Sequence, residues 1–147
     1  MSDQLAKSII VKGDASRIYN LWNDFESFPH FMKNIKYVRK TGLRTSHWVM
    51  TGPMGKDLQW DAQITDLQEN KRIAWSTIDG DLKTSGQVTF NPLEQGETEV
   101  TVMMKYFPPG GRLGEAAAQL FDKPDKRLEE DLRRFKKYVE MQPAAHN

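Results

Sequence analysis

The clearest hydrophobic pattern in the sequence is helical and runs from Leu113 to about Met141. Apolar residues recur there at steps of three, four and seven, which places them on one stripe of an α-helix, while the opposite face is strongly charged. The stripe consists of Leu113, Ala117, Leu120, Phe121, Leu128, Leu132, Phe135 and Val139. Pro124 interrupts the run, so we expect a kink near Asp122 to Pro124 or two helices end to end. At ~1.5 Å per residue the element would be about 40 Å long and would need a wide apolar partner.

The middle of the chain has a different pattern, in which apolar and polar residues alternate with a period of two. Such alternation is typical of strands in an antiparallel sheet that has one wet face. The segment 57–67 shows it best, with Leu58, Trp60, Ala62 and Ile64 on one face. Strands are predicted at 5–11, 35–40, 46–51, 57–67, 72–78, 84–90 and 98–107. A hairpin turn is expected at 79–81, where the sequence reads Asp-Gly-Asp.

Two short helices are expected after the first strand. Asp14 is placed to cap the first of them, which carries Ile18 and Trp22 among its apolar residues. The second lies within 24–32, a short segment that is rich in phenylalanine and contains a proline. The predicted fold is therefore α+β: a curved antiparallel sheet of about seven strands wrapped around a long C-terminal helix, with two short helices closing one end. This arrangement is known as the helix-grip fold.

Composition removes several classes of function. With 147 residues the chain is expected to form one domain, and the absence of cysteine excludes disulfides, thiolate metal sites and a cysteine nucleophile. The formal charge of +1 argues against nucleic acid as a partner. The basic run 133–137 lies one turn from three acidic residues and is interpreted as a solvated helix face. Because there is neither an apolar run long enough to span a bilayer nor an export signal, we expect no transmembrane segment and a cytoplasmic location.

Seven stretches of the sequence carry a resemblance to a known family. They are SIIV at 8–11, IYNLW at 18–22, FESFPHFM at 25–32, WDAQI at 60–64, RIAW at 72–75, GQVTF at 86–90 and LEEDLRRFK at 128–136. Together with the order of the elements they resemble the START-like (SRPBCC) superfamily, and within it the bacterial polyketide cyclase/dehydrase group that includes the coenzyme Q-binding proteins. The resemblance covers about 5–140 and implies a single START-like ligand-binding domain over 1–147, with an apolar cavity between sheet and helix. Some relatives are polyketide aromatases or cyclases and others carry ligands, and no catalytic motif transfers residue by residue.

Large apolar side chains on the inner face are the candidate ligand-binding residues, because such groups line most small-molecule pockets. The candidates are Phe28, Phe31, Met32, Trp48, Met50, Trp60, Ala62, Trp75, Val88, Phe90, Met104, Tyr106, Leu120 and Phe121. Phe28, Phe31 and Met32 are expected at the mouth of the cavity. The alternative for each of these residues is that it only fills the core.

Candidates for catalysis are few. The hydroxyl of Tyr106, Tyr19 or Tyr37 could orient a ligand, although a buried tyrosine needs a partner in any protein. His30 is expected at the rim facing solvent, and His47 and Asp61 should point away from the cavity. No two histidines have the spacing of metal ligands, and there is no glycine-rich phosphate loop. We therefore assign no catalytic, cofactor or metal residues.

These observations predict a protein that binds a hydrophobic small molecule such as a lipid, quinone or polyketide, as a carrier or sequestering protein, and acts as a monomer or homodimer. The alternative is a polyketide aromatase/cyclase that acts on a poly-β-keto chain in the same cavity, although the inner face offers few polar groups for it. A third hypothesis is an interaction protein with a filled core. The loops at 52–56 and 108–111 are candidate gates over the cavity.

Overall fold

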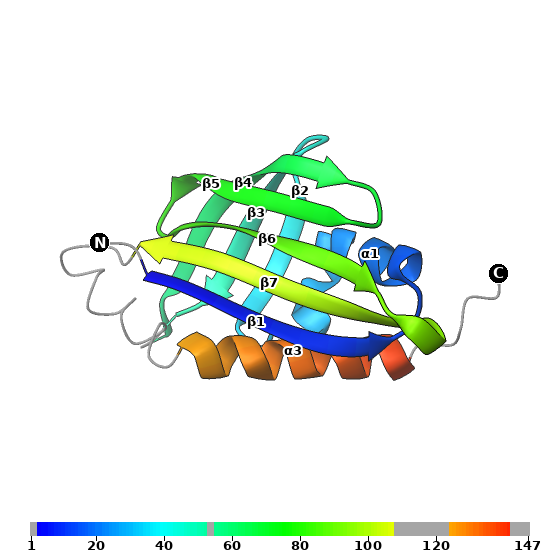
Figure 1. The fold of residues 1–147 in the computed structure, drawn as a ribbon. Coiled ribbons are helices and arrows are strands. Elements are labelled where there is room, and N and C mark those ends of the chain that lie inside the picture. Colours follow the sequence, from blue (N-terminus) through cyan, green and yellow to red (C-terminus); the bar gives the residue numbers. More distant parts are fainter. Residues whose placement is uncertain (1–2, 53–54, 108–123, 142–147) are drawn as a thin grey trace.

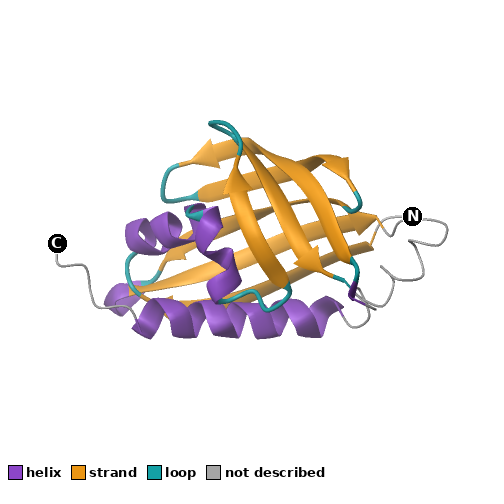
Figure 2. Ribbon diagram, turned by 180° about the vertical axis from the view of Figure 1, so that it is seen from behind, coloured by secondary structure: helices purple, strands orange, loops and turns teal. Residues whose placement is uncertain are grey.

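The computed structural model describes residues 3–52, 55–107 and 124–141. Its elements, in chain order, are β1 (Asp3–Lys12), α1 (Ala15–Asn23), the short 3-10 helix η1 (Phe25–His30), β2 (Ile35–Lys40), β3 (Thr45–Thr51), β4 (Asp57–Gln68), β5 (Arg72–Gly80), β6 (Lys83–Pro92), the 3-10 turn η3 (Glu94–Gly96), β7 (Glu97–Phe107) and α3 (Pro124–Met141). The seven strands form one antiparallel sheet in the order β1-β7-β6-β5-β4-β3-β2. The sheet curls over α3, and α1 and η1 lie at one end of the space between them (Figures 1 and 2). The predicted helix-grip fold is confirmed.

The C-terminal helix begins at Pro124 within the described residues. Proline is well suited to the first helical position, because the N–H that it lacks would have no partner there. The predicted apolar stripe is present on α3: Leu128, Leu132, Phe135 and Val139 are all buried. The expected helix over 113–123 and the expected kink lie outside the described residues.

The connection between β5 and β6 differs from the prediction. The turn expected at 79–81 does not reverse the chain at Gly80, because β5 continues there and pairs with β4, where Gly80 lies opposite Trp60. A Cβ on Gly80 would lie 2.4 Å from the Trp60 Cα, and the φ of Gly80 is +128°, so glycine permits this close approach. The backbone N–H of Asp81 donates to the Gln59 carbonyl at 2.7 Å, and the chain then turns and buries Leu82.

The end of the molecule that holds α1 is fastened by polar contacts as well as by packing. The Asp14 carboxylate accepts from the Arg17 backbone N–H at 2.8 Å, which is the predicted helix cap. On α3, Lys136 Nζ donates to the Ile10 carbonyl at 2.9 Å, and Glu140 accepts from the Lys12 backbone N–H at 3.0 Å. These bonds attach the last turns of α3 to the end of β1.

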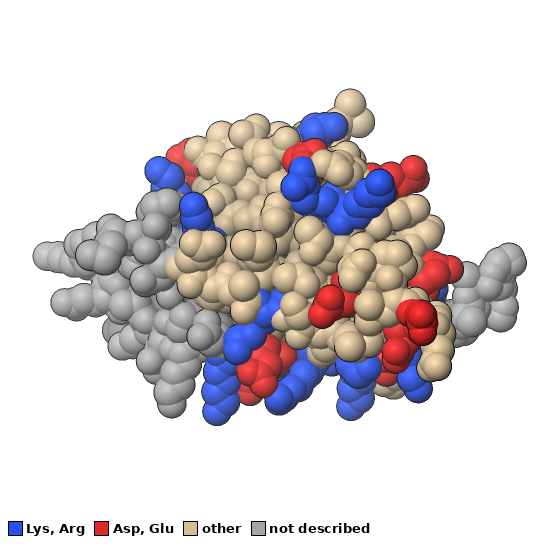
Figure 3. Space-filling view, viewed as in Figure 1, with Lys and Arg blue, Asp and Glu red and all other residues tan. Residues whose placement is uncertain are grey.

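The surface separates a charged helix from a less charged sheet. In Figure 3 the charged side chains gather along α3, while the middle of the outer sheet face in front carries few of them. The solvent-facing sides of β1 and β7 include Ile10 and Met103, which are 44% and 38% exposed. Within the described part of the chain, no helix combines the length and the hydropathy that crossing a membrane requires.

Candidate functional site

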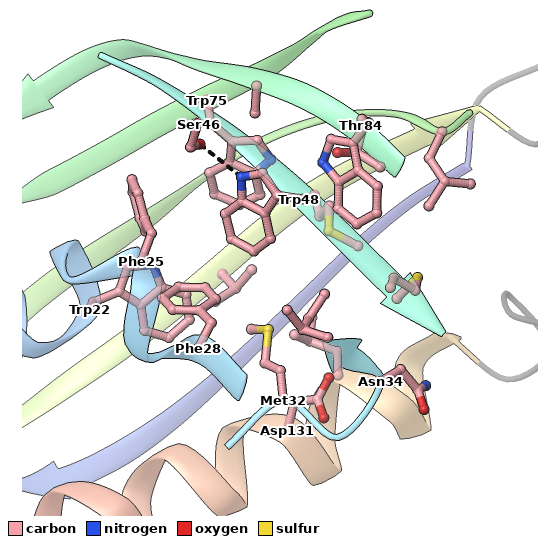
Figure 4. Close-up of a pocket in the computed structure, with 18 of the residues that line it drawn as sticks. Trp22, Phe25, Phe28, Met32, Asn34, Ser46, Trp48, Trp75, Thr84 and Asp131 are labelled. Atoms are coloured by element: carbon pink, nitrogen blue, oxygen red, sulfur yellow. Dashed lines mark hydrogen bonds between the residues drawn. The ribbon is translucent and has the colours of Figure 1, made fainter. Parts of the chain in front are cut away.

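A cavity of about 210 Å³ lies between the sheet and the first half of α3 (Figure 4). Its walls come from α1, η1, strands β2 to β7 and α3, so residues far apart in the sequence meet there. Most of the lining is aromatic, aliphatic or thioether. The lining residues are Trp22, Phe25, Phe28, Met32, Asn34, Ile35, Ser46, Trp48, Met50, Trp60, Ala62, Gln63, Ile64, Trp75, Leu82, Thr84, Val102, Met104, Arg127, Leu128 and Asp131.

Stacked tryptophans form part of the sheet wall. Trp48 on β3 lies directly opposite Trp60 on β4, and their rings stack with centroids 5.9 Å apart and planes 13° apart. The ring of Phe28 meets Trp48 edge-on at 5.2 Å, which joins η1 to this wall. Residues directly opposite each other on neighbouring strands share a face of the sheet, so both tryptophans point into the cavity. Rigid flat surfaces of this kind suit a ligand that contains rings.

A glycine makes room for the third tryptophan of the wall. Trp75 on β5 is paired with Gly86 on β6. A Cβ built on Gly86 would lie 3.0 Å from the Trp75 ring and 2.4 Å from the Met103 carbonyl oxygen. Any larger residue at Gly86 would push the indole or the backbone out of place, so this glycine permits the position of Trp75.

One polar group is buried deep in the sheet wall. The Ser46 side chain is two residues before Trp48 on the same face of β3, and Ser46 is only 6% exposed. Its Oγ accepts a hydrogen bond from Trp48 Nε1 at 2.8 Å, drawn as a dashed line in Figure 4. The bond satisfies the buried indole N–H and fixes the orientation of the ring.

An acidic group lies in the opposite wall, on α3 (Figure 4). The Asp131 side chain is 27% exposed, and its Oδ1 accepts from Arg134 Nη1 at 2.8 Å. Burial raises the pKa of Asp131 to about 6, from an ordinary value of 3.8, because the charged form loses hydration there. The guanidinium groups of Arg134 and Arg127 act in the opposite direction but do not cancel the effect of burial. The cavity therefore contains a carboxyl group that exchanges its proton close to neutral pH.

The structure distributes the candidate ligand-binding residues over three environments. Eight of them line the cavity: Phe28, Met32, Trp48, Met50, Trp60, Ala62, Trp75 and Met104. Phe31, Val88 and Phe90 are instead buried in the packed core and are not among the lining residues. Tyr106 pairs with Thr84 through the backbone of β7, but its side chain lies outside the described part, as do Leu120 and Phe121.

Several lining residues were not proposed from the sequence, although the hydrophobic pattern indicates an inward position for some of them. Ser46 shares the face of Trp48 by simple alternation, and Trp22 belongs to the apolar side of α1. Asp131 immediately precedes the buried Leu132 and so lies on the flank of the apolar stripe. Leu82 had no such signal, because its burial depends on the pairing between β4 and β5.

The remaining titratable candidates lie away from the cavity. His47 and Asp61 point to the outer face, as alternation predicts, and their side chains are bonded at 2.8 Å between Nδ1 and Oδ1. His30 is exposed and stacks on Tyr138, with centroids 5.8 Å apart. Burial, assisted by the negative charge of Glu69, raises the pKa of Tyr19 above its ordinary value of 10.0. Among the described side chains, no three or more His, Cys, Asp or Glu residues are grouped to hold a metal ion.

Comparison with known proteins identifies the family of this chain. Residues 11–133 match the model of the family described as polyketide cyclase/dehydrase and lipid transport. An uncharacterized 17.2 kDa protein from the melC2-rnhH intergenic region of Streptomyces lincolnensis is 31% identical over 137 residues, which cover 93% of this chain and 89% of that protein.

Solved structures show the same fold. A START superfamily protein from Mycobacterium smegmatis superimposes with a TM-score of 0.70 at 18% identity, covering 92% of this chain and 98% of that one. The Zhui aromatase/cyclase from Streptomyces sp. R1128 has a TM-score of 0.76 at 14% identity and covers 99% of both chains. At these identities the likeness concerns the fold. The family match, which spans most of the chain, shows that this chain belongs to the polyketide cyclase/dehydrase and lipid transport family.

Proposed function

We propose that the protein binds a hydrophobic small molecule in the cavity between the sheet and α3, as a carrier or sequestering protein. The observation that supports this most directly is the lining itself: three inward-facing tryptophans of the sheet, two phenylalanines of η1 and three methionines surround about 210 Å³ of space. A lipid, a quinone or a polyketide-like molecule with ring character fits such walls.

The energetics are adequate without covalent chemistry. A ligand that buries ~400 Å² of apolar area gains roughly 10 kcal/mol before costs are counted. Immobilising the ligand removes a large part of that gain. Micromolar binding is therefore the expected order of affinity, and it needs only a preformed apolar cavity.

Native mass spectrometry of the protein purified from its own cells tests this function, followed by organic extraction and identification of what is released. We expect a reproducible lipophilic adduct. Ala62→Leu, which adds bulk to the cavity wall, should reduce the adduct, whereas the matched Ala6→Leu on the exposed face of β1 should retain it. An adduct that survives equally in both variants would place the bound molecule elsewhere.

A second function, polyketide aromatase/cyclase, is favoured by one specific observation, the presence of Asp131 in the cavity wall. A carboxyl whose pKa is about 6 can both accept and donate a proton near neutral pH, as ring closure and loss of water from a poly-β-keto chain require. The fold shared with the Zhui aromatase/cyclase is compatible with this reaction. We expect that an enzyme of this type would change the product profile of a reconstituted polyketide synthase and that Asp131→Asn would abolish the change. The same products with and without the protein would exclude this function.

A further inference from the structure

We propose that the ligand carries a carbonyl oxygen and that Ser46 binds it by donating its hydroxyl proton. This inference rests on the proposed ligand-binding function and names the chemical group that the site selects. It comes from the hydrogen bonding of Ser46 and from the separation of charged groups between the two walls of the cavity.

The hydroxyl of Ser46 has an unused proton. An indole N–H can only donate, so in the 2.8 Å bond with Trp48 the serine oxygen is the acceptor and its own hydrogen takes no part. Among the described residues, no acceptor is bonded to that hydrogen. Ser46 is more than nine-tenths buried, so its proton has little access to bulk water. A buried donor without a partner is costly, and a ligand that supplies an acceptor removes that cost.

The bond from Trp48 also makes Ser46 a better donor. A hydroxyl that accepts one hydrogen bond is polarised and donates more strongly through its own proton. The same bond occupies one lone pair of the oxygen, which reduces the ability of Ser46 to accept from a ligand. A ligand acceptor is therefore preferred over a ligand donor at this point of the wall.

The surroundings favour a neutral acceptor. The side chains that share the sheet wall with Ser46 include Trp48, Trp60 and Ala62, which carry no charge. The charged lining residues, Arg127 and Asp131, belong to α3. Figure 4 shows Asp131 on the wall opposite Ser46. A carboxylate at Ser46 would lose its hydration without gaining a cation, whereas a ketone or quinone oxygen loses far less. The stacked indoles beside Ser46 provide flat surfaces for a ring attached to that carbonyl.

A matched pair of probes isolates this bond. 1-Tetralone and tetralin have the same two-ring skeleton and differ by one carbonyl in place of a methylene group. Dissociation constants for both probes are measured by titration calorimetry on the wild type and on Ser46→Ala. The factor by which Ser46→Ala weakens tetralone binding is then divided by the corresponding factor for tetralin. The difference in hydrophobicity between the two probes cancels from this quotient. We expect Ser46→Ala to weaken tetralone binding about fivefold more than tetralin binding, as one neutral hydrogen bond predicts.

Thr84→Val is the matched control, because Thr84 also contributes a hydroxyl to the lining. The Thr84 Oγ1 lies 3.4 Å from the Thr77 Oγ1, and Thr84 is only partly buried. The carbonyl preference should persist in Thr84→Val. If it disappears there and persists in Ser46→Ala, the assignment to Ser46 is wrong.

A measurement on the wild type alone tests the same hydrogen bond and does not require the Ser46→Ala variant to fold. The infrared carbonyl band of bound, ¹³C-labelled 1-tetralone should lie below its frequency in an alkane, because a hydrogen bond weakens the C=O bond. A bound carbonyl that vibrates as it does in an alkane overturns the inference. Equal effects of Ser46→Ala on both probes also overturn it, while leaving the proposed binding function intact. Failure of the wild type to bind either probe contradicts the proposed function and this inference together.

Discussion

The two halves of the space between the sheet and α3 are built from the same layers but are filled to different extents. Toward the C-terminal end of α3, Phe135 meets Trp22 edge-on at 4.9 Å and Phe31 at 5.0 Å, and all three rings are at least 97% buried. Toward its N-terminal end, Leu128 and Asp131 face the cavity. We call these the packed half and the open half.

The difference shows how one layer arrangement combines a packed core with a cavity. In the packed half, Phe135 of α3 interlocks with the buried rings of Trp22 on α1 and of Phe31, so this half stabilises the fold by packing. In the open half the side chains of Trp48, Trp75 and Met104 remain only partly buried, because they border the cavity. A fold that contains a cavity needs both halves, since a cavity lowers stability unless another part of the core compensates.

The largest expected effect on stability comes from removing an aromatic ring from the packed half. Phe135→Ala should lower the free energy of unfolding by about 3–5 kcal/mol, because it removes a fully buried ring and leaves a void. Urea denaturation measures the change. Met104→Ala, which removes a partly buried side chain from the open half, is the comparison and should cost clearly less. Equal losses in the two variants would contradict the division into halves.

The next effect concerns the carboxyl group of the open half. Since the pKa of Asp131 is about 6 in the folded protein and 3.8 ordinarily, the folded state keeps a proton between these values that the unfolded state has released. Stability from this group is therefore present below pH 4, falls as the pH rises to 6 and is constant above that. The expected fall is about 1–3 kcal/mol, allowing for partial exposure of the side chain.

Asp131→Asn provides the control for this pH dependence, because it keeps the shape of the side chain and cannot titrate. Urea denaturation of both proteins between pH 4 and pH 8 should show the additional fall in the wild type alone. Parallel curves would mean that Asp131 has no raised pKa, and the case for acid–base chemistry in the cavity would lose its support.

A smaller effect on stability, together with a clear effect on binding, is expected for Trp75→Ala. The indole is partly buried and lines the cavity, so its removal should cost stability less than Phe135→Ala does. Affinity for 1-tetralone should change by about tenfold, equivalent to 1.4 kcal/mol, as calorimetry would show. Unchanged affinity would remove Trp75 from the binding surface.

The smallest effect is expected at the outer end of the packed half, where Glu140 joins α3 to β1. Its hydrogen bond from Lys136 Nζ at 2.7 Å, with the bond from the Lys12 N–H, holds the pKa of Glu140 below its usual value. The stability that it contributes is present above the usual pKa and is lost as the pH falls through the lowered one. Glu140→Gln should cost less than about 1 kcal/mol at pH 7, and the difference should shrink as the pH falls through the lowered pKa of Glu140. A loss that does not change as the pH is lowered would indicate packing instead of charge.

Most of the fold could be predicted from sequence, because each element has a local period. Alternation placed Trp48, Trp60 and Trp75 on the inner face, and helical spacing placed Phe135 on the inner stripe of α3. The period of two in a strand shows which face of the sheet a residue points to. It does not show whether that residue lies over the cavity or over the packed half. Phe90 shares the inner face of β6, yet it meets Tyr19 and Trp22 in the packed half and does not reach the cavity.

Other features of the site could not be predicted because they depend on pairing between strands or on the flank of a helix. Leu82 is buried because β5, with a register shift between Asp61 and Ala62, continues to Gly80 inside the expected turn. The charged Asp131 has a pattern typical of a solvated helix face, and only the cavity beside it makes it part of the lining. The sequence therefore predicted an apolar interior but missed the two polar groups on which the proposals rest, Ser46 and Asp131.

All four tryptophans of the chain line the same cavity. Ultraviolet light absorbed by indole is consequently absorbed at the wall of this cavity, and the emission that follows reports on the cavity and on the packed rings around Trp22. A ring that enters beside Trp48 and Trp60 would displace water, alter the colour of that emission and quench part of it. If the cavity binds a ligand as proposed, this emission is an optical sensor of its occupancy, and candidate ligands can be screened without attaching a dye.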